Sequence, residues 1–248
     1  MTSDETRFGL RVLVTIGKGI CLGLLVASFI SQSAAAAEPV VAEPQPGVAH
    51  HSKRVNFERE SASPDVRYMA DWVVDSGDNR SMPFVIVDKK DAKVFVFNAD
   101  GRLRGVSRAL LGLAVGDDSV PGIGERKLAS ILPEERTTPA GRFVASMDHN
   151  LHGGDILWVD YEAAVSLHPV ITSNPKERRA QRLATPTPLD KRISYGCINV
   201  PAAFFKNVVS TAFKSTSGIV YVLPETRPAQ TVFHSYSVDE RESSLAHR

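Results

Sequence analysis

The chain has 248 residues, with 29 Lys and Arg against 28 Asp and Glu, and 43% of its residues are hydrophobic. This length suits one domain with flexible ends. The balanced charge gives no support to nucleic acid or an anionic membrane surface as a partner.

The first 37 residues show the three-part pattern of a cleaved secretory signal. Basic residues come first, an uncharged apolar run follows at 19–30, and small residues of the Ala-x-Ala type lie at 34–37. The run is shorter than the roughly 20 residues of a bilayer span, so we expect a cleaved signal (1–37) rather than an uncleaved anchor. Cys21 lies inside the run and not after it, which argues against lipidation. In both cases the rest of the chain acts outside the cytoplasm.

Removing these 37 residues from 248 leaves 211, and removing 3 basic and 2 acidic residues from 29 and 28 leaves 26 of each, a formal charge of zero. Residues 38–80 are predicted to be a flexible linker. The proline-rich part, 38–64, buries too little apolar surface to offset the entropy of ordering. Apolar residues within 68–73 are spaced i, i+1, i+4 and i+5, which predicts a short helix inside 65–80. We expect a polar tail at 226–248.

Between these ends, residues 81–225 are predicted to form one mostly β (β-rich α+β) domain. β-branched and aromatic residues predict strands at 83–88, 93–98, 104–115, 141–146, 155–160, 164–168 and 218–223. The Asp100-Gly101 step predicts a hairpin turn. Residues 201–211 begin with proline and carry four large apolar residues on one helical face, which predicts a helix.

Residues 194–199 read Ser-Tyr-Gly-Cys-Ile-Asn and contain Cys197, the one cysteine of the expected mature chain. A lone cysteine has no disulfide partner in its own chain, so it is either an inert buried thiol or a nucleophile. A short glycine-containing turn that exposes the thiol favours the nucleophile. His168, at the end of an apolar run, is the candidate base, and a hydrogen-bonded core histidine is the alternative. His149 and His152 are rival bases in an expected loop.

These residue types suit acyl transfer. Cys197 would attack a peptide carbonyl and expel an amine that His168 protonates, leaving a thioester. A second amine then makes the chain a transpeptidase, and water makes it a hydrolase. The backbone N–H groups of Tyr195, Gly196 and Cys197 would stabilise the oxyanion, and glycine allows close approach. Ser194 would either orient His168 or cap the turn.

The tyrosine of this turn would either donate a hydrogen bond or pack. The histidines show no metal-ligand spacing and the glycines form no phosphate-binding loop, so we expect no metal and no cofactor.

The motif resembles the L,D-transpeptidase catalytic domain, also called the YkuD domain. The matching residues are His168, Ser194, Gly196, Cys197 and Asn199. The opening hairpin at 85–97 and the Thr-Pro-Ala-Gly-Arg-Phe segment at 138–143 are also similar, so the resemblance covers about 83–224. It implies a β-sandwich or barrel with a helix packed after the nucleophile, and Asn199 as a supporting residue, while Tyr195 is a further candidate supporting residue from its place in the turn.

The resemblance also implies an activity. It points to an exported cysteine-dependent L,D-transpeptidase of the periplasm or cell envelope, with a role in cell-wall biogenesis and cell shape. The partners would be peptidoglycan stem peptides, with a neighbouring stem, a free D-amino acid or a wall-anchored protein as acceptor. The alternatives are a peptidoglycan hydrolase (L,D-carboxypeptidase or endopeptidase) on the same scaffold, and a non-catalytic wall-binding module.

Three features depart from the family pattern. Tyr195 stands where the family has a histidine, and Pro169 follows His168 where Gly or Ser is usual. The segment from His168 to Ser194 is longer than the family's spacer and is polar and basic. For the arginine cluster at 178–192 we expect a solvated loop face, and binding of substrate carboxylates is the alternative.

Overall fold

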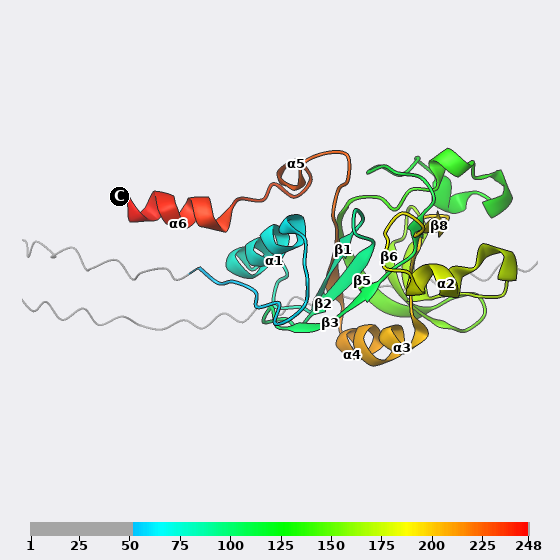
Figure 1. Ribbon diagram of the computed structural model, residues 1–248, viewed down its shortest axis with the longest axis horizontal. Coiled ribbons are helices and arrows are strands. Elements are labelled where there is room, and N and C mark those ends of the chain that lie inside the picture. Colours follow the sequence, from blue (N-terminus) through cyan, green and yellow to red (C-terminus); the bar gives the residue numbers. More distant parts are fainter. Residues whose placement is uncertain (1–51, 248) are drawn as a thin grey trace, which may run out of the picture. The chain divides into compact units, whose positions relative to one another are not determined.

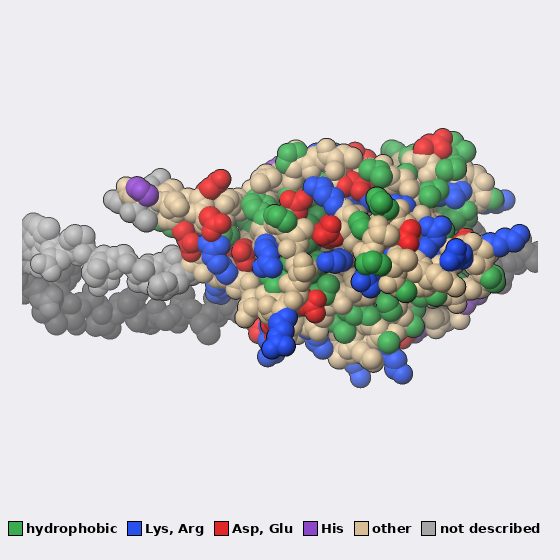
Figure 2. Space-filling view, viewed as in Figure 1, with side chains coloured by type: hydrophobic (Ala, Val, Ile, Leu, Met, Phe, Trp, Pro, Cys, Tyr) green, Lys and Arg blue, Asp and Glu red, His purple; other side chains and the backbone are tan. Residues whose placement is uncertain are grey.

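The computed structural model describes residues 52–247 (Figure 1). The expected signal at 1–37, which includes Cys21, and residues 38–51 of the expected linker lie outside the described residues. Within 52–247, no helix is both long and apolar enough to cross a membrane. Basic and acidic side chains are interspersed over the face seen in Figure 2.

The centre of the fold is an eight-stranded mixed sheet in the order β3-β2-β1-β10-β5-β6-β7-β9. Its strands are β1 (Phe84–Asp88), β2 (Lys93–Phe97), β3 (Leu103–Arg108), β5 (Gly141–His149), β6 (Asp155–Asp160), β7 (Val165–Pro169), β9 (Ile198–Val200) and β10 (Gly218–Val222). A separate parallel pair consists of β4 (Leu111–Gly112) and β8 (Arg192–Ser194).

The sheet curves into a near-barrel. Leu110, just beyond the edge strand β3, exchanges two backbone hydrogen bonds of 2.8 Å with Asn199 on the opposite edge strand, β9. This contact brings the two edges of the sheet together. The predicted mostly β fold is therefore confirmed, and a strand is present in each region where the sequence predicted one.

The central strands are buried on both faces. Successive side chains of a strand point to opposite faces, so Val85 and Val87 join one core cluster while Phe84 and Ile86 join the other. A strand covered on both sides needs apolar residues at every position, which explains the unbroken apolar runs in the sequence.

One face is covered by α1 (Pro64–Ser76), the helix predicted inside 65–80. The Ser63 side chain caps it by accepting a hydrogen bond from the Val66 N–H at 3.3 Å, and Gly77 ends it at φ 70°. Its buried side chains, Met69 among them, lie in the cluster that contains Phe84.

The other face is covered by the helical segment predicted at 201–211. It consists of α3 (Ala202–Phe204), a π-helical turn (Phe205–Val209) and α4 (Ser210–Phe213). Phe205 and Val209 are buried with the valines of β1. The predicted helix after Cys197 is confirmed, and Figure 1 shows it on a different side of the strands from α1.

Further elements went beyond the prediction. These are the strands β8 and β9, the helices α2 (Arg179–Ala184), α5 (Ala229–Phe233) and α6 (Val238–Ala246), and short 3-10 turns at Ile123–Glu125, Leu128–Ser130, Pro133–Glu135 and Pro175–Glu177. Residues 52–63, expected to be part of a flexible linker, carry Phe57, which is 3% exposed and packs edge-on against Phe95 and Phe97. One aromatic ring supplies the burial that the proline-rich composition lacks.

Candidate active site

Strand register brings the two halves of the motif together. β7 and β9 pair in parallel, with Leu167 opposite Ile198 and His168 opposite Asn199. The same register places Ser166 beside Cys197, which directly precedes β9. Because side chains alternate along a strand, Ser166, His168 and Asn199 lie on the same face as Cys197.

The turn before β9 is held by side-chain hydrogen bonds. The Ser194 hydroxyl donates to the Cys197 carbonyl at 2.6 Å and accepts from the Gly196 N–H at 3.1 Å. Thr138 Oγ1 donates to the Gly196 carbonyl at 2.8 Å. Gly196 has φ +131°, and a Cβ there would lie 2.8 Å from the Thr137 carbonyl oxygen. Only glycine fits this position, because a side chain would collide with the Thr137 carbonyl oxygen. The backbone conformation that presents the thiol therefore depends on Gly196.

A buried ion pair anchors the segment that carries Thr138. The Lys89 ammonium is fully buried and donates to Asp117 Oδ1 at 2.7 Å and to the carbonyl oxygens of Gly116 and Thr138 at 2.6 and 3.0 Å. A buried charge is stable only when it is paired and its donors are satisfied, which these contacts achieve.

The thiol of Cys197 is free and half-buried. Its Sγ lies 3.7 Å from Ser166 Oγ and donates to the Ala164 carbonyl at 3.8 Å. His168 Nδ1 lies 2.8 Å from the Pro169 carbonyl oxygen. Because a carbonyl only accepts, Nδ1 carries the proton and Nε2 is the nitrogen left for proton transfer.

The two groups shift each other's ionisation. Burial opposes loss of the Cys197 proton, but the hydrogen bond and charge of His168, with hydrogen bonds from Ser166, lower the pKa of the thiol. Burial also opposes protonation of His168, but the hydrogen bond and charge of Cys197 outweigh it and raise the pKa of the imidazole. Both shifts favour a thiolate–imidazolium pair.

These shifts set a pH dependence for alkylation of Cys197 by iodoacetamide. Because the thiol pKa is lowered, the rate should reach half its plateau at a pH below the ordinary thiol value of about 8.5. In His168→Ala the half-maximum should move to higher pH, since burial is then opposed only by the hydrogen bonds of Ser166. Peptide mapping of the modified residue measures both profiles. Identical profiles in the two proteins would show that His168 does not ionise the thiol.

The N–H groups expected around the oxyanion are not equivalent. The Gly196 N–H is already bonded to the Ser194 hydroxyl. Among the described residues, the N–H groups of Tyr195 and Cys197 have no hydrogen-bond partner. Ser194 does not contact His168, so of its two expected roles its contacts are those of a turn cap.

Tyr195 packs rather than donates. The Arg136 guanidinium lies 3.9 Å above the centre of its ring, and within residues 52–247 its hydroxyl makes no hydrogen bond. Arg136 is fixed in turn by a 3.0 Å hydrogen bond to the Ile131 carbonyl. Tyr195 therefore joins the turn to the segment before β5.

Tyr195→Phe should leave turnover nearly unchanged, because it keeps the stacked ring and removes a hydroxyl that has no partner. Tyr195→Ala should reduce kcat/KM further, since it removes the cation–π contact, worth roughly 0.5–1 kcal/mol at an exposed site, and loosens the turn. Steady-state kinetics of both variants tests this. A loss of 10⁴-fold or more in Tyr195→Phe, on the order of 5 kcal/mol, would mean that the hydroxyl takes part in proton transfer.

The rival histidines lie on the β5–β6 hairpin, and among residues 52–247 neither bonds to the Cys197 thiol. His149 is exposed and its Nε2 lies 3.2 Å from Asp155 Oδ1. His152 is also exposed. In the arginine cluster, Arg178 is exposed as expected, whereas Arg179 and Arg192 are turned inward, with only 13% and 16% of their side chains exposed. The expectation of a wholly solvated loop face is therefore wrong, because these two arginines have buried partners.

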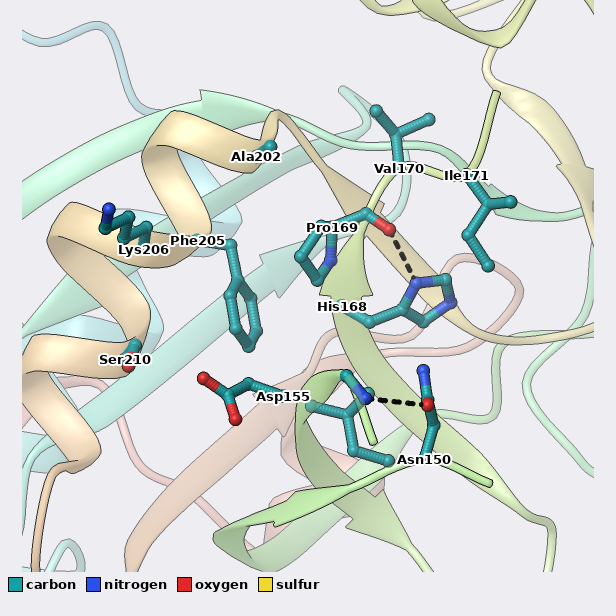
Figure 3. A pocket seen from close by; sticks show the side chains of 12 residues that line it. Asn150, Asp155, His168, Pro169, Val170, Ile171, Ala202, Phe205, Lys206 and Ser210 are labelled. Atoms are coloured by element: carbon teal, nitrogen blue, oxygen red, sulfur yellow. Dashed lines mark hydrogen bonds between the residues drawn. The ribbon is translucent and has the colours of Figure 1, made fainter. Parts of the chain in front are cut away.

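A cavity of about 420 Å³ opens beside His168 (Figure 3). Apolar side chains line much of it, including Ile156, Pro169, Ile171 and Phe205, with Asp155 and Lys206 among the polar groups. Figure 3 shows the His168 ring at one side of this cavity and the helical segment at the other.

Sequence reasoning missed three residues of the site. Ser166 lies in a strand region that was predicted for its apolar neighbours, Thr138 lies just before the strand predicted at 141–146, and Arg179 was one of several basic residues in a polar segment. The Thr-Pro motif at 138–139 was the one available signal. Among residues 52–247, no three His, Cys, Asp or Glu side chains cluster so as to hold a metal ion.

No protein-family model and no curated protein matches the chain. Solved structures match part of it. The helical cell shape determining protein Pgp2 from Campylobacter jejuni matches at 16% identity and a TM-score of 0.41, over 65% of this chain and 52% of its own. The L,D-transpeptidase from Xylanimonas cellulosilytica DSM 15894 matches at 16% identity and 0.36, over 57% and 60%. The LD transpeptidase LdtMt1, solved with imipenem, matches at 15% and 0.33, over 57% and 58%. The chain spans about half the length of the Pgp2 structure.

Proposed function

We propose that this chain is an exported, cysteine-dependent L,D-transpeptidase that acts on peptidoglycan stem peptides. One observation carries the proposal. Four residues of the Cys197 turn, Ser194, Gly196, Cys197 and Asn199, match the YkuD motif, and with His168 opposite Asn199 in the register of β7 and β9, His168 and Cys197 lie on the same face of adjacent strands. The mutual pKa shifts of the two groups support a nucleophile and its base.

The mechanism follows from these positions. The Cys197 thiolate attacks the carbonyl carbon after the L-centre of the diamino acid, and the N–H groups of Tyr195 and Cys197 are the candidates to stabilise the oxyanion. The intermediate expels the amine of the terminal D-residue, which takes its proton from His168, and a thioester remains. His168 then accepts a proton from the incoming amine, which forms the new amide bond and releases the thiolate.

The site leaves room for a second substrate. The cavity beside His168 is apolar along much of its wall and has His168 at its edge. An amine that approaches from there would come close to the His168 ring. A stem side chain, a free D-amino acid or the amine of a wall-anchored protein are the candidate acceptors. The segment 1–37 would direct the protein to the periplasm or cell envelope, and 81–225 would form the catalytic domain, with α1 from the expected linker 38–80 packed against its sheet.

Incubation with purified disaccharide-tetrapeptides, with and without a free D-amino acid, tests this function. Cross-linked dimers or exchange of the terminal residue, identified by mass spectrometry, support transfer. Shortened stems alone indicate a hydrolase, and unchanged stems together with co-sedimentation of the protein with insoluble peptidoglycan indicate a wall-binding module. Imipenem is a second probe. Intact-mass analysis should show an adduct that maps to Cys197, and no adduct would contradict an accessible, activated thiol.

A further inference from the structure

The buried side chain next to the base is held by an arginine from the long segment between β7 and β8. Arg179 NH1 donates to Asn199 Oδ1 at 2.7 Å. The Arg179 Nε pairs with the Glu177 carboxylate. Asn199 itself has no exposed surface. An arginine–amide contact at this depth fixes both partners, because neither can exchange its bond for one with water.

Arg179 decides which way the Asn199 amide faces. A guanidinium only donates, so the amide atom that meets it is the oxygen. The Asn199 NH₂ group then faces the Cys197 carbonyl oxygen and His168 Nε2, each at 3.3 Å. A flipped amide would put its NH₂ group against the guanidinium and its oxygen against a carbonyl, and both contacts would be repulsive.

This orientation selects one tautomer of the neutral His168 imidazole. The Asn199 NH₂ donates, so Nε2 of His168 accepts and carries no proton, while Nδ1 keeps its proton on the Pro169 carbonyl. The positive charge of Arg179 also disfavours the imidazolium. Other charged groups around His168 are Cys197 on the turn before β9, Glu177 beside Arg179, and Asp155 and Lys206 across the cavity.

The segment that carries Arg179 is tied down. The Lys191 side chain is 1% exposed, and its ammonium bonds to Asp190 Oδ1 at 2.7 Å and to the Thr185 carbonyl at 3.1 Å. Arg182 donates to the Glu177 carbonyl at 2.9 Å. These contacts fold the polar segment back on itself around α2. The added length therefore forms an ordered arm and not a loose loop.

We propose that Arg179 is a positioning residue which, through Asn199, favours the neutral Nδ1–H tautomer of His168 and aligns its Nε2 for proton transfer. Cys197 pulls His168 toward the charged form and Arg179 opposes it. Without Arg179, the imidazole would hold its second proton to higher pH and would exchange between its two neutral tautomers. The role as base rests on the proposed function, whereas the effect on His168 itself does not.

The test uses ¹⁵N NMR of the histidine rings in the full chain, in a Cys197→Ser background that removes the thiolate and needs no substrate. With Arg179 present, neutral His168 should show the Nδ1–H tautomer alone. Arg179→Met should raise the titration midpoint by about 0.5–1 pH unit and give averaged tautomer shifts. Arg179→Lys keeps the charge, so its His168 titration midpoint should stay close to that of the Cys197→Ser protein with Arg179 present. Arg178→Met is the matched control and should leave His168 unchanged, since that side chain is exposed.

An unchanged midpoint and tautomer in Arg179→Met would overturn the proposal. Should the methionine variant not fold, Arg179→Gln removes the charge and keeps a donor for Asn199, and an unchanged midpoint there has the same meaning. If the muropeptide assay gave no product but Arg179→Met still changed the His168 titration and tautomer, the proposed function would be wrong and this inference would stand. If products formed but Arg179→Met left the His168 titration and tautomer unchanged, this inference would be wrong and the proposed function would stand.

Discussion

Cys197→Ser is expected to lower product formation from tetrapeptide stems by at least about 10⁴-fold. Serine has nearly the same shape as cysteine and still fits the turn. Its hydroxyl, however, stays protonated where the thiol, whose pKa is lowered by His168, loses its proton. The loss therefore comes from the chemistry of the nucleophile. Chromatography of the muropeptide products measures it.

Two measurements keep this result interpretable. Circular dichroism and the thermal midpoint should be close to those of the original chain, because the Ser194 and Thr138 hydrogen bonds to the turn use backbone atoms that the substitution leaves in place. Transpeptidation that persists in Cys197→Ser would eliminate the thioester mechanism.

His168→Ala is expected to lower kcat by about 10²–10⁴-fold, the usual contribution of a general acid–base group. The imidazole both ionises the thiol and supplies the proton that the departing amine needs. Its Nδ1 is anchored on the Pro169 carbonyl, so no other side chain can take its place without a change of backbone. Steady-state kinetics over a range of pH values measures the loss.

His149→Ala and His152→Ala are the controls for this prediction. Both side chains are exposed on the β5–β6 hairpin, and His149 pairs with Asp155. Each variant should keep kcat within about twofold, as surface substitutions away from a site usually do. If His152→Ala caused the larger loss, the assignment of the base would be wrong.

The sequence predicted the elements whose cause is local. Strands and helices follow from the spacing of apolar residues, so β1, β2, the hairpin turn at Gly101 and α1 lie where the pattern put them. The cysteine turn could also be read locally, because glycine and a lone thiol have few alternative explanations. Average composition predicted less well for the expected linker. Phe57 is buried there, although the residues around it are mostly polar.

Only the tertiary structure decided the neighbours of the thiol. Ser166 and Asn199 reach Cys197 and His168 through the register of two parallel strands, and the connection between those strands is long. Periodicity predicts that a strand exists but does not say which strand it pairs with. The same limit applies to Arg179. The sequence does not distinguish Arg179 from the arginines near it. The left-handed backbone of Arg178, at φ 50°, precedes Arg179, whose side chain turns inward to Asn199. Long-range contacts of this kind depend on the backbone path of the whole chain, which no short sequence pattern specifies.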